Sequence, residues 1–176
     1  MASSHYKPAA GDTSTSSFEA SDQMTRGSSD SYEQSLKDGT GPTFIAEALR
    51  VIVGKGETQE IDLTGESSEI DHVVLREGCS YTKEIQFKVM HDVVVGLHYH
   101  QVTTWTKDDI PLDETHLLMG SYEPRTESYV FISPVTFAPK GIMARGCFDV
   151  KSFLCDDDGN EFKRWKWIMQ VERISE

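Results

Sequence analysis

The sequence predicts an all-β fold, an antiparallel β-sandwich, behind a separate N-terminal arm. From residue 44 onward, short runs rich in Val, Ile, Thr and aromatic residues alternate with Gly, Pro, Asp and Asn turn signals. No long segment shows the 3.6-residue apolar period of an amphipathic helix. Composition also changes sharply near Thr40. We therefore expect two parts, an arm over residues 1–43 and a sandwich over residues 44–176.

Each expected strand is a short run bounded by residues that favour turns. Gly54-Lys55-Gly56 separates the first two runs, and Asp158-Gly159-Asn160 separates the last two. Turn signals such as Asp108-Asp109-Ile110-Pro111 fill the interval between the fifth and sixth runs, where no strand is expected. The expected strands cover residues 49–53, 59–63, 72–75, 81–89, 97–105, 128–132, 142–152 and 162–171.

The arm is too polar to form a core of its own. Fourteen of its first 40 residues are Ser or Thr, so it buries too little apolar surface to offset chain entropy and should be largely disordered when free. One stretch favours a helix, because Asp30 and Glu33 resemble a capping box and Tyr32 and Leu36 lie one turn apart. A helix of about two turns is marginal alone, so we expect a partner surface to complete it.

The charge and the cysteine pattern exclude several classes of protein. A net charge of −12 disfavours a nucleic-acid partner, because phosphate binding needs a basic face. Three cysteines without C-x-x-C spacing disfavour a disulfide framework and a zinc fold. The first residues lack the layout of a secretory signal, and no apolar run is long enough to cross a bilayer. The sequence therefore predicts a cytoplasmic protein.

The segment 165–171 carries two tryptophans on one strand face. Strand alternation places Trp165, Trp167 and Met169 on the same side. One interpretation is that the tryptophans fill an ordinary sandwich core. The other is that they form the wall of an apolar ligand cavity between the sheets. The pattern alone leaves both open.

No pattern in the chain assembles a catalytic or metal site. His98 and His100 share a strand face and could hold zinc with His116, but the sequence places no carboxylate or thiol at ligand spacing. The consecutive aspartates of segment 156–160 are typical of a hairpin turn rather than of a calcium loop. Nucleophile elbows and dinucleotide-binding loops do not occur. We expect no cofactor, no metal and no enzymatic activity.

A series of motifs occurs in a fixed order across roughly residues 60–172 and resembles the Rho GDP-dissociation inhibitor family. In the arm, Tyr6-Lys7-Pro8 is similar to the Tyr-Lys-Pro of that family, and segment 32–39 is similar to its second arm helix. The sandwich motifs are Ile61-Asp62-Leu63-Thr64-Gly65, Ile85-Gln86-Phe87-Lys88-Val89, Val95-Gly96-Leu97-His98-Tyr99, Met119-Gly120-Ser121-Tyr122-Glu123-Pro124-Arg125, Ser133-Pro134-Val135, Ala138-Pro139-Lys140-Gly141-Ile142-Met143-Ala144-Arg145-Gly146, Lys151-Ser152-Phe153, Asp156-Asp157-Asp158 and Trp165-x-Trp167.

The resemblance implies an immunoglobulin-like sandwich whose two sheets open to accept a geranylgeranyl chain. It also implies that the arm packs on the switch regions of a small GTPase. Matching positions assign prenyl binding to Val73, Leu75, Phe87, Val93, Val150, Trp165 and Trp167. They assign GTPase binding to Tyr6, Tyr32, Leu36, Asp113, Glu127, Asp157 and Asp158.

The implied function is inhibition of GDP dissociation. Such a protein binds GDP-bound prenylated GTPases of the Rho and Rac type, extracts them from membranes during a transient encounter and buries their lipid tail in the cytosol. Thr136 and Phe137 stand where relatives carry two glutamates, which predicts a weaker patch for the basic tail of the GTPase. The alternative is a carrier for prenyl or acyl tails of lipidated proteins outside the Rho family. The helical arm argues against that alternative.

Overall fold

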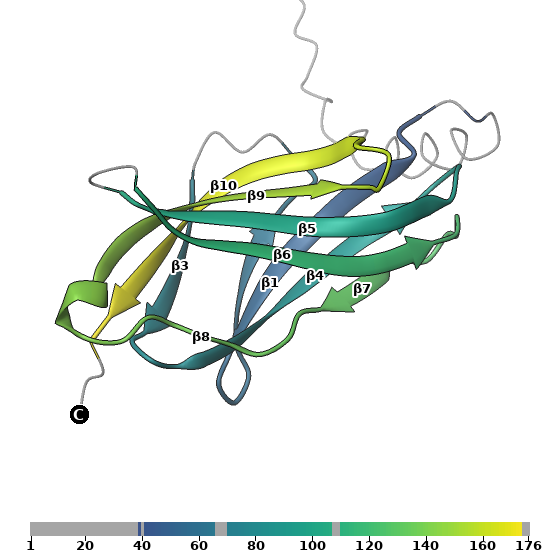
Figure 1. The fold of residues 1–176 in the computed structure, drawn as a ribbon. Coiled ribbons are helices and arrows are strands. Elements are labelled where there is room, and N and C mark those ends of the chain that lie inside the picture. The colour runs from purple at the N-terminus through teal and green to yellow at the C-terminus, as the bar shows by residue number, and fades with distance from the viewer. Residues whose placement is uncertain (1–38, 40, 66–69, 107–109, 174–176) are drawn as a thin grey trace, which may run out of the picture.

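The computed structural model describes residues 39, 41–65, 70–106 and 110–173. Over these residues the chain forms two facing β-sheets (Figure 1). The first sheet contains β1 (Phe44–Val53), β2 (Glu57–Asp62), β4 (Ser80–Val89), β7 (Tyr129–Ile132) and β8 (Thr136–Phe137). The second contains β3 (Asp71–Arg76), β5 (Val94–Trp105), β6 (Pro111–Tyr122), β9 (Gly146–Cys155) and β10 (Glu161–Glu172), and the 3₁₀ turn η1 (Ile142–Ala144) precedes β9.

The strand order confirms the predicted all-β sandwich. The first sheet runs β2-β1-β4-β7, with β8 also paired to β4, and the second runs β3-β10-β9-β5-β6. Every pair is antiparallel except β3 with β10, which is parallel. The predicted arm helix around Tyr32 and Leu36 lies outside the described residues, and so does Tyr6 of the Tyr-Lys-Pro motif.

Strand β6 is absent from the sequence prediction. Among the described residues it pairs only with β5, as an edge strand, and Met119 is its one buried residue. Its segment Asp113-Glu114-Thr115-His116 is polar on both faces. An edge strand with so little buried surface leaves no alternating apolar signal in the sequence.

The strand expected over residues 142–152 begins later than predicted. Ile142 and Met143 form the turn η1, and the strand starts at Gly146. Gly141 has a φ of 108° and Gly146 a φ of 139°, and an L-residue rarely adopts either angle. The two glycines therefore bracket η1 and the strand begins only at Gly146, although Ile142, Met143 and Ala144 are apolar.

The core lies between the inner faces of the two sheets. Strand alternation places Trp165, Trp167, Met169 and Val171 on the buried face of β10, as predicted. Facing them, Ile85 and other residues of β1 and β4 are fully buried. Burial of this shared face is the main term that stabilises the sandwich.

The two ends of the sandwich are built from different parts of the chain. The hairpin end contains the turn 156–160 and the start of β1, where Phe44 stacks on Phe162 at 4.7 Å and pairs with Val89. The cavity end contains η1, β8, the start of β4 and the end of β5 (Figure 1). The arm, which precedes β1, joins the sandwich at the hairpin end.

Candidate functional site

A cavity of about 510 Å³ lies between the sheets at the cavity end. This volume is within the range of small-molecule and lipid sites. The apolar lining residues are Tyr81, Trp105, Leu112, Phe137, Pro139, Met143, Ala144, Phe148 and Met169. The polar lining residues are Gln101, Thr103, Asp113, Thr136 and Lys140.

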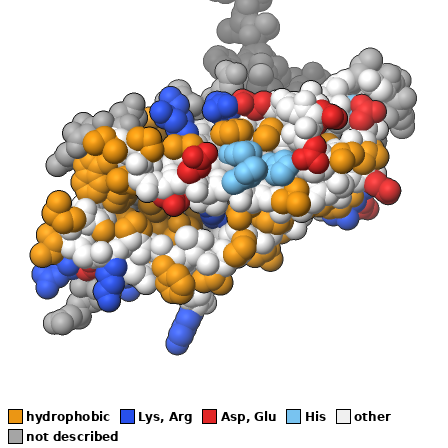
Figure 2. All heavy atoms as spheres, in the orientation of Figure 1, with side chains coloured by type: hydrophobic (Ala, Val, Ile, Leu, Met, Phe, Trp, Pro, Cys, Tyr) orange, Lys and Arg blue, Asp and Glu red, His pale blue; other side chains and the backbone are white. Residues whose placement is uncertain are grey.

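The mouth of the cavity is surrounded by exposed apolar side chains. Leu112 is 53% exposed, Phe137 68% and Met143 88%. Hydrophobic side chains gather at this end in Figure 2, over the region of η1 and β8. A contiguous apolar patch at a cavity mouth indicates a surface that binds an apolar partner.

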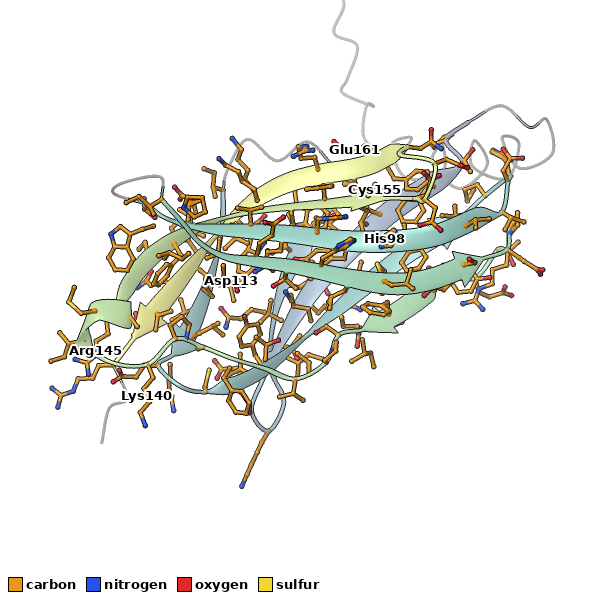
Figure 3. All side chains as sticks on the ribbon, in the orientation of Figure 1. His98, Asp113, Lys140, Arg145, Cys155 and Glu161 are labelled. Atoms are coloured by element: carbon orange, nitrogen blue, oxygen red, sulfur yellow. The ribbon has the colours of Figure 1, made fainter. Side chains whose placement is uncertain are left out.

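A buried glutamate fixes the chain that carries these residues. Glu77 accepts hydrogen bonds from Arg145 Nη2 at 2.8 Å and from the backbone N–H of Gly141 at 3.0 Å. The two bonds bracket η1, and Figure 3 shows Arg145 and Lys140 together at this end. Gly78 N–H also donates to the carbonyl oxygen of Ala138 at 3.2 Å. The exposed Met143 is therefore held on a fixed loop.

The inner end of the cavity is polar. The Oε1 atom of Gln101 accepts hydrogen bonds from Lys83 Nζ at 2.6 Å and from the Tyr99 hydroxyl at 2.8 Å. The Tyr99 hydroxyl lies 3.0 Å from Ser152 Oγ, which accepts a bond from Trp167 Nε1 at 3.2 Å. We call these five residues the inner polar network.

Burial shifts the pKa of Lys83 and Tyr99 in this network and of the nearby cavity residue Tyr81. It lowers the pKa of Lys83 from 10.5 to about 8, against the opposing attraction of Asp113. It raises the pKa of Tyr81 to about 12, and it also raises the pKa of Tyr99. Each shift follows from the cost of placing a charge in a medium of low polarity.

The residues assigned to prenyl binding lie elsewhere in the sandwich. Val73, Leu75, Phe87, Val150, Trp165 and Trp167 are buried, and Val93 is 54% exposed in the turn before β5. None of the seven lines the 510 Å³ cavity. In this structure the six buried residues are core residues, so their assignment to the lipid stays a prediction.

Trp165 borders a second, smaller cavity of about 340 Å³ near the edge of β10. Lys163, Arg164 and Asp62 also line it. The indole N–H of Trp165 is buried and has no hydrogen-bond partner among the described residues. The mixed charge of this lining makes it a poor site for a hydrocarbon chain.

The hairpin end presents acidic side chains. Asp157 and Asp158 are exposed in the turn between β9 and β10, which confirms the predicted hairpin. Asp157 Oδ1 lies 2.7 Å from His98 Nε2. A Cβ atom at Gly96 would lie 2.0 Å from an Asp157 carboxylate oxygen, so only glycine permits this approach.

His98 belongs to a patch of three histidines on the outer face of β5 and β6. His98 Nδ1 lies 3.1 Å from His116 Nε2, and the rings of His100 and His116 stack at 3.8 Å. The histidines form one pale-blue patch in Figure 2. The structure supplies the carboxylate that sequence spacing did not reveal, that of Asp157. Within the described residues, no group of three or more ligands has a geometry that could hold a metal ion.

The two remaining acidic residues of the prediction lie apart. Asp113 is exposed on β6 and lines the cavity. Glu127 is exposed in the segment between β6 and β7, where Arg125 Nε donates to its carbonyl oxygen at 3.1 Å. Asp113 therefore belongs to the cavity end, whereas Glu127 follows the last residues of β6 at the hairpin end (Figure 1).

Comparison with known proteins identifies the family. Residues 23–174 match the family model described as RHO protein GDP dissociation inhibitor. The chain belongs to the Rho GDP-dissociation inhibitor family. Rho GDP-dissociation inhibitor 1 of Homo sapiens is 35% identical over 139 residues, which cover 77% of this chain and 67% of the relative. The protein of the same name from Rattus norvegicus is 39% identical with the same coverage. A probable rho GDP-dissociation inhibitor from Caenorhabditis elegans is 31% identical over 133 residues, 73% of this chain and 68% of the relative.

The names of these three relatives describe inhibition of GDP dissociation and not a catalysed reaction. Membership in this family agrees with the motifs in the sandwich and with GTPase regulation as the general role. Over the described residues, the structure contains no helix long and apolar enough to cross a membrane.

Proposed function

We propose that this protein inhibits GDP dissociation from prenylated Rho- and Rac-type GTPases and carries them through the cytosol. The observation that carries the proposal is the cavity between the sheets, with its exposed apolar mouth at Leu112, Phe137 and Met143. The resemblance to this family implies that such a cavity accepts the geranylgeranyl tail of the GTPase. The inhibitor would bind the GDP-bound form and act without catalysis.

The free energy of lipid transfer indicates that extraction needs a contact with the GTPase in addition to the lipid cavity. A twenty-carbon chain has a gross transfer term on the order of 10 kcal/mol, because each buried CH₂ contributes about 0.8 kcal/mol. The bilayer offers nearly the same term, so the cavity alone does not extract the lipid. A second contact, between the inhibitor and the protein part of the GTPase, must therefore supply the free energy that favours extraction. Because the lipid and the protein part belong to one molecule, the first contact raises the effective concentration for the second.

The hairpin end is where we place this second contact. The arm joins the sandwich there, and the exposed Asp157, Asp158 and Glu127 lie at the same end. Acidic side chains favour rapid encounter with a basic surface. In the proposal, the arm with Tyr6, Tyr32 and Leu36 binds the switch regions, and the lipid then transfers to the cavity.

The experiment is extraction of GDP-loaded, geranylgeranylated Rac-type GTPase from liposomes, with release of labelled GDP measured in parallel. The proposed function requires both extraction and slower GDP release. Extraction of acylated or prenylated cargo outside the Rho family, without any effect on GDP release, would favour the alternative carrier. Absence of both activities would contradict the proposal.

A further inference from the structure

Lys83 occupies an unusual position for a lysine. Its side chain points from β4 into the sandwich, and the residue is 2% exposed. Lysine is almost never fully buried unless a partner neutralises it. Within the described residues no carboxylate forms an ion pair with Lys83, and Nζ donates one hydrogen bond, to Gln101 Oε1. Nζ also lies 4.9 Å from the centre of the Tyr99 ring.

Lys83 lies at the inner end of the cavity. Along β5 the inward side chains of Trp105, Thr103 and Gln101 line it in succession, and the next inward residue, Tyr99, does not. Along β4, Tyr81 lines the cavity and the next inward residue, Lys83, does not. The hydrogen bond between Lys83 and Gln101 thus closes the inner end.

A hydrocarbon chain that passes this point must disturb the closure. It must either break the bond between Lys83 and Gln101 or lie against an ammonium with two further N–H donors. Each choice leaves a polar group buried without a partner, which is costly. The residues beyond the closure, including Ile85 and Phe87, are fully buried core residues.

The available depth matches a shorter isoprenoid. Four residue steps along β5, from Trp105 to Gln101, span about 13 Å. This is close to the length of three extended isoprene units and short of four. We propose that Lys83 and Gln101 set the depth of the cavity, so that a fifteen-carbon and a twenty-carbon isoprenoid bind with similar affinity. This inference rests on the proposed function, because it assumes that the cavity holds a lipid.

The test is calorimetric titration of the full-length protein with S-farnesylcysteine methyl ester and S-geranylgeranylcysteine methyl ester. At pH 7 the two dissociation constants should differ by less than about threefold. Full burial of five more carbons would instead favour the longer chain on the order of 1,000-fold. A preference above about tenfold in the unmodified protein overturns the inference.

Replacing Lys83 by an apolar residue should let a ligand reach further into the cavity. Lys83→Met should increase affinity for the geranylgeranyl ligand by about tenfold or more and change affinity for the farnesyl ligand by less than threefold. The matched control is Lys88→Met, because Lys88 lies on the same strand but faces outward. The control should leave both affinities unchanged. An unaltered ratio in a folded Lys83→Met protein overturns the inference.

A second measurement needs no variant. Because the pKa of Lys83 is near 8, raising the pH from 7 to 9 removes the ammonium charge and should raise relative affinity for the longer chain several-fold. No change in the ratio with pH overturns the inference even if Lys83→Met does not fold. Absence of binding by either ligand overturns the proposed lipid cavity and this inference with it, whereas binding with an unchanged ratio overturns the inference alone.

Discussion

The two ends of the sandwich use ionisable residues in opposite ways. At the cavity end Lys83 is buried and loses most of its preference for the charged state. At the hairpin end Asp157 and Asp158 stand in solvent. A buried charge lowers the stability of the fold and affects only the groups packed around it. Exposed charges attract a partner over about a Debye length and have little effect on the stability of the fold. The cavity end is therefore suited to selecting a lipid, and the hairpin end to capturing a protein.

Deleting residues 1–40 should have the largest effect and should separate the two ends. Without the arm, inhibition of GDP release should be lost, because the remaining sandwich lacks the segment proposed to bind the switch regions. Binding of geranylgeranylcysteine methyl ester should stay within about twofold of the full-length protein. The measurements are release of labelled GDP and calorimetry. Full inhibition by the truncated protein would contradict the assignment of the arm.

A charge placed at the mouth should impair only the lipid contact. Met143→Glu should reduce extraction of geranylgeranylated GTPase from liposomes at least tenfold, because the lipid must then pass an ionised carboxylate at the cavity mouth. Binding of unprenylated GTPase should not change. The control is Val130→Glu, since Val130 on β7 is an exposed apolar residue that lies outside the cavity lining. Equal losses in the two variants would show that the mouth has no special role.

The buried lysine also makes stability depend on pH. Its pKa in the folded protein, about 8, lies below its ordinary value of 10.5. The unfolded chain therefore binds more protons between these values, and stability rises with pH in this range. Between pH 7 and pH 9 the gain should be about 1 kcal/mol, measured by urea denaturation.

Two controls isolate this gain. The Lys83→Met protein should lack it, and a gain of the same size in that variant would assign it to another group. Above pH 10 the raised pKa values of Tyr81 and Tyr99 act in the opposite direction. The unfolded chain then loses phenolic protons that the folded protein keeps, so stability should fall.

The smallest effect should come from the hairpin. Asp157→Asn should slow association with the GTPase about threefold at low salt, because one steering charge is lost. The difference should disappear at 1 M salt, where the Debye length is about 3 Å. Stopped-flow fluorescence measures the rate, and Glu57→Gln is a control, because Glu57 is an exposed carboxylate on β2. A defect that persists at high salt would indicate a direct packing role.

The fold was largely predictable because most strands have one buried face. The alternation that places Trp165 and Trp167 inside β10 is a local property, and the structure confirms it. Strand β6 was not predictable from this signal, since Met119 is its only buried residue. The turn η1 was also missed, because apolar residues at Ile142 and Met143 resemble a strand although they are exposed.

The candidate site was less predictable than the fold. The family motifs pointed to Trp167 and Phe87, which are core residues here. The cavity is instead defined by residues such as Phe137, which the pairing of β8 with β4 holds in place, and Met143, which lies on the turn fixed by Glu77. Lys83 gave one sequence signal, a lysine at an inward position of the predicted strand 81–89. Its bond to Gln101, eighteen residues away, depends on how the two sheets face each other.

The position of β10 within the second sheet has a consequence for synthesis. β10 is the last strand of the described residues, yet it lies between β3 and β9. β3 has no other strand partner among the described residues. It therefore stays unpaired while seven later elements are synthesised, until β10 is available. Closure over such a sequence separation is slow. While the chain is still on the ribosome, the apolar face of the first sheet lacks part of its cover, and the nascent protein should depend on chaperones until β10 has emerged.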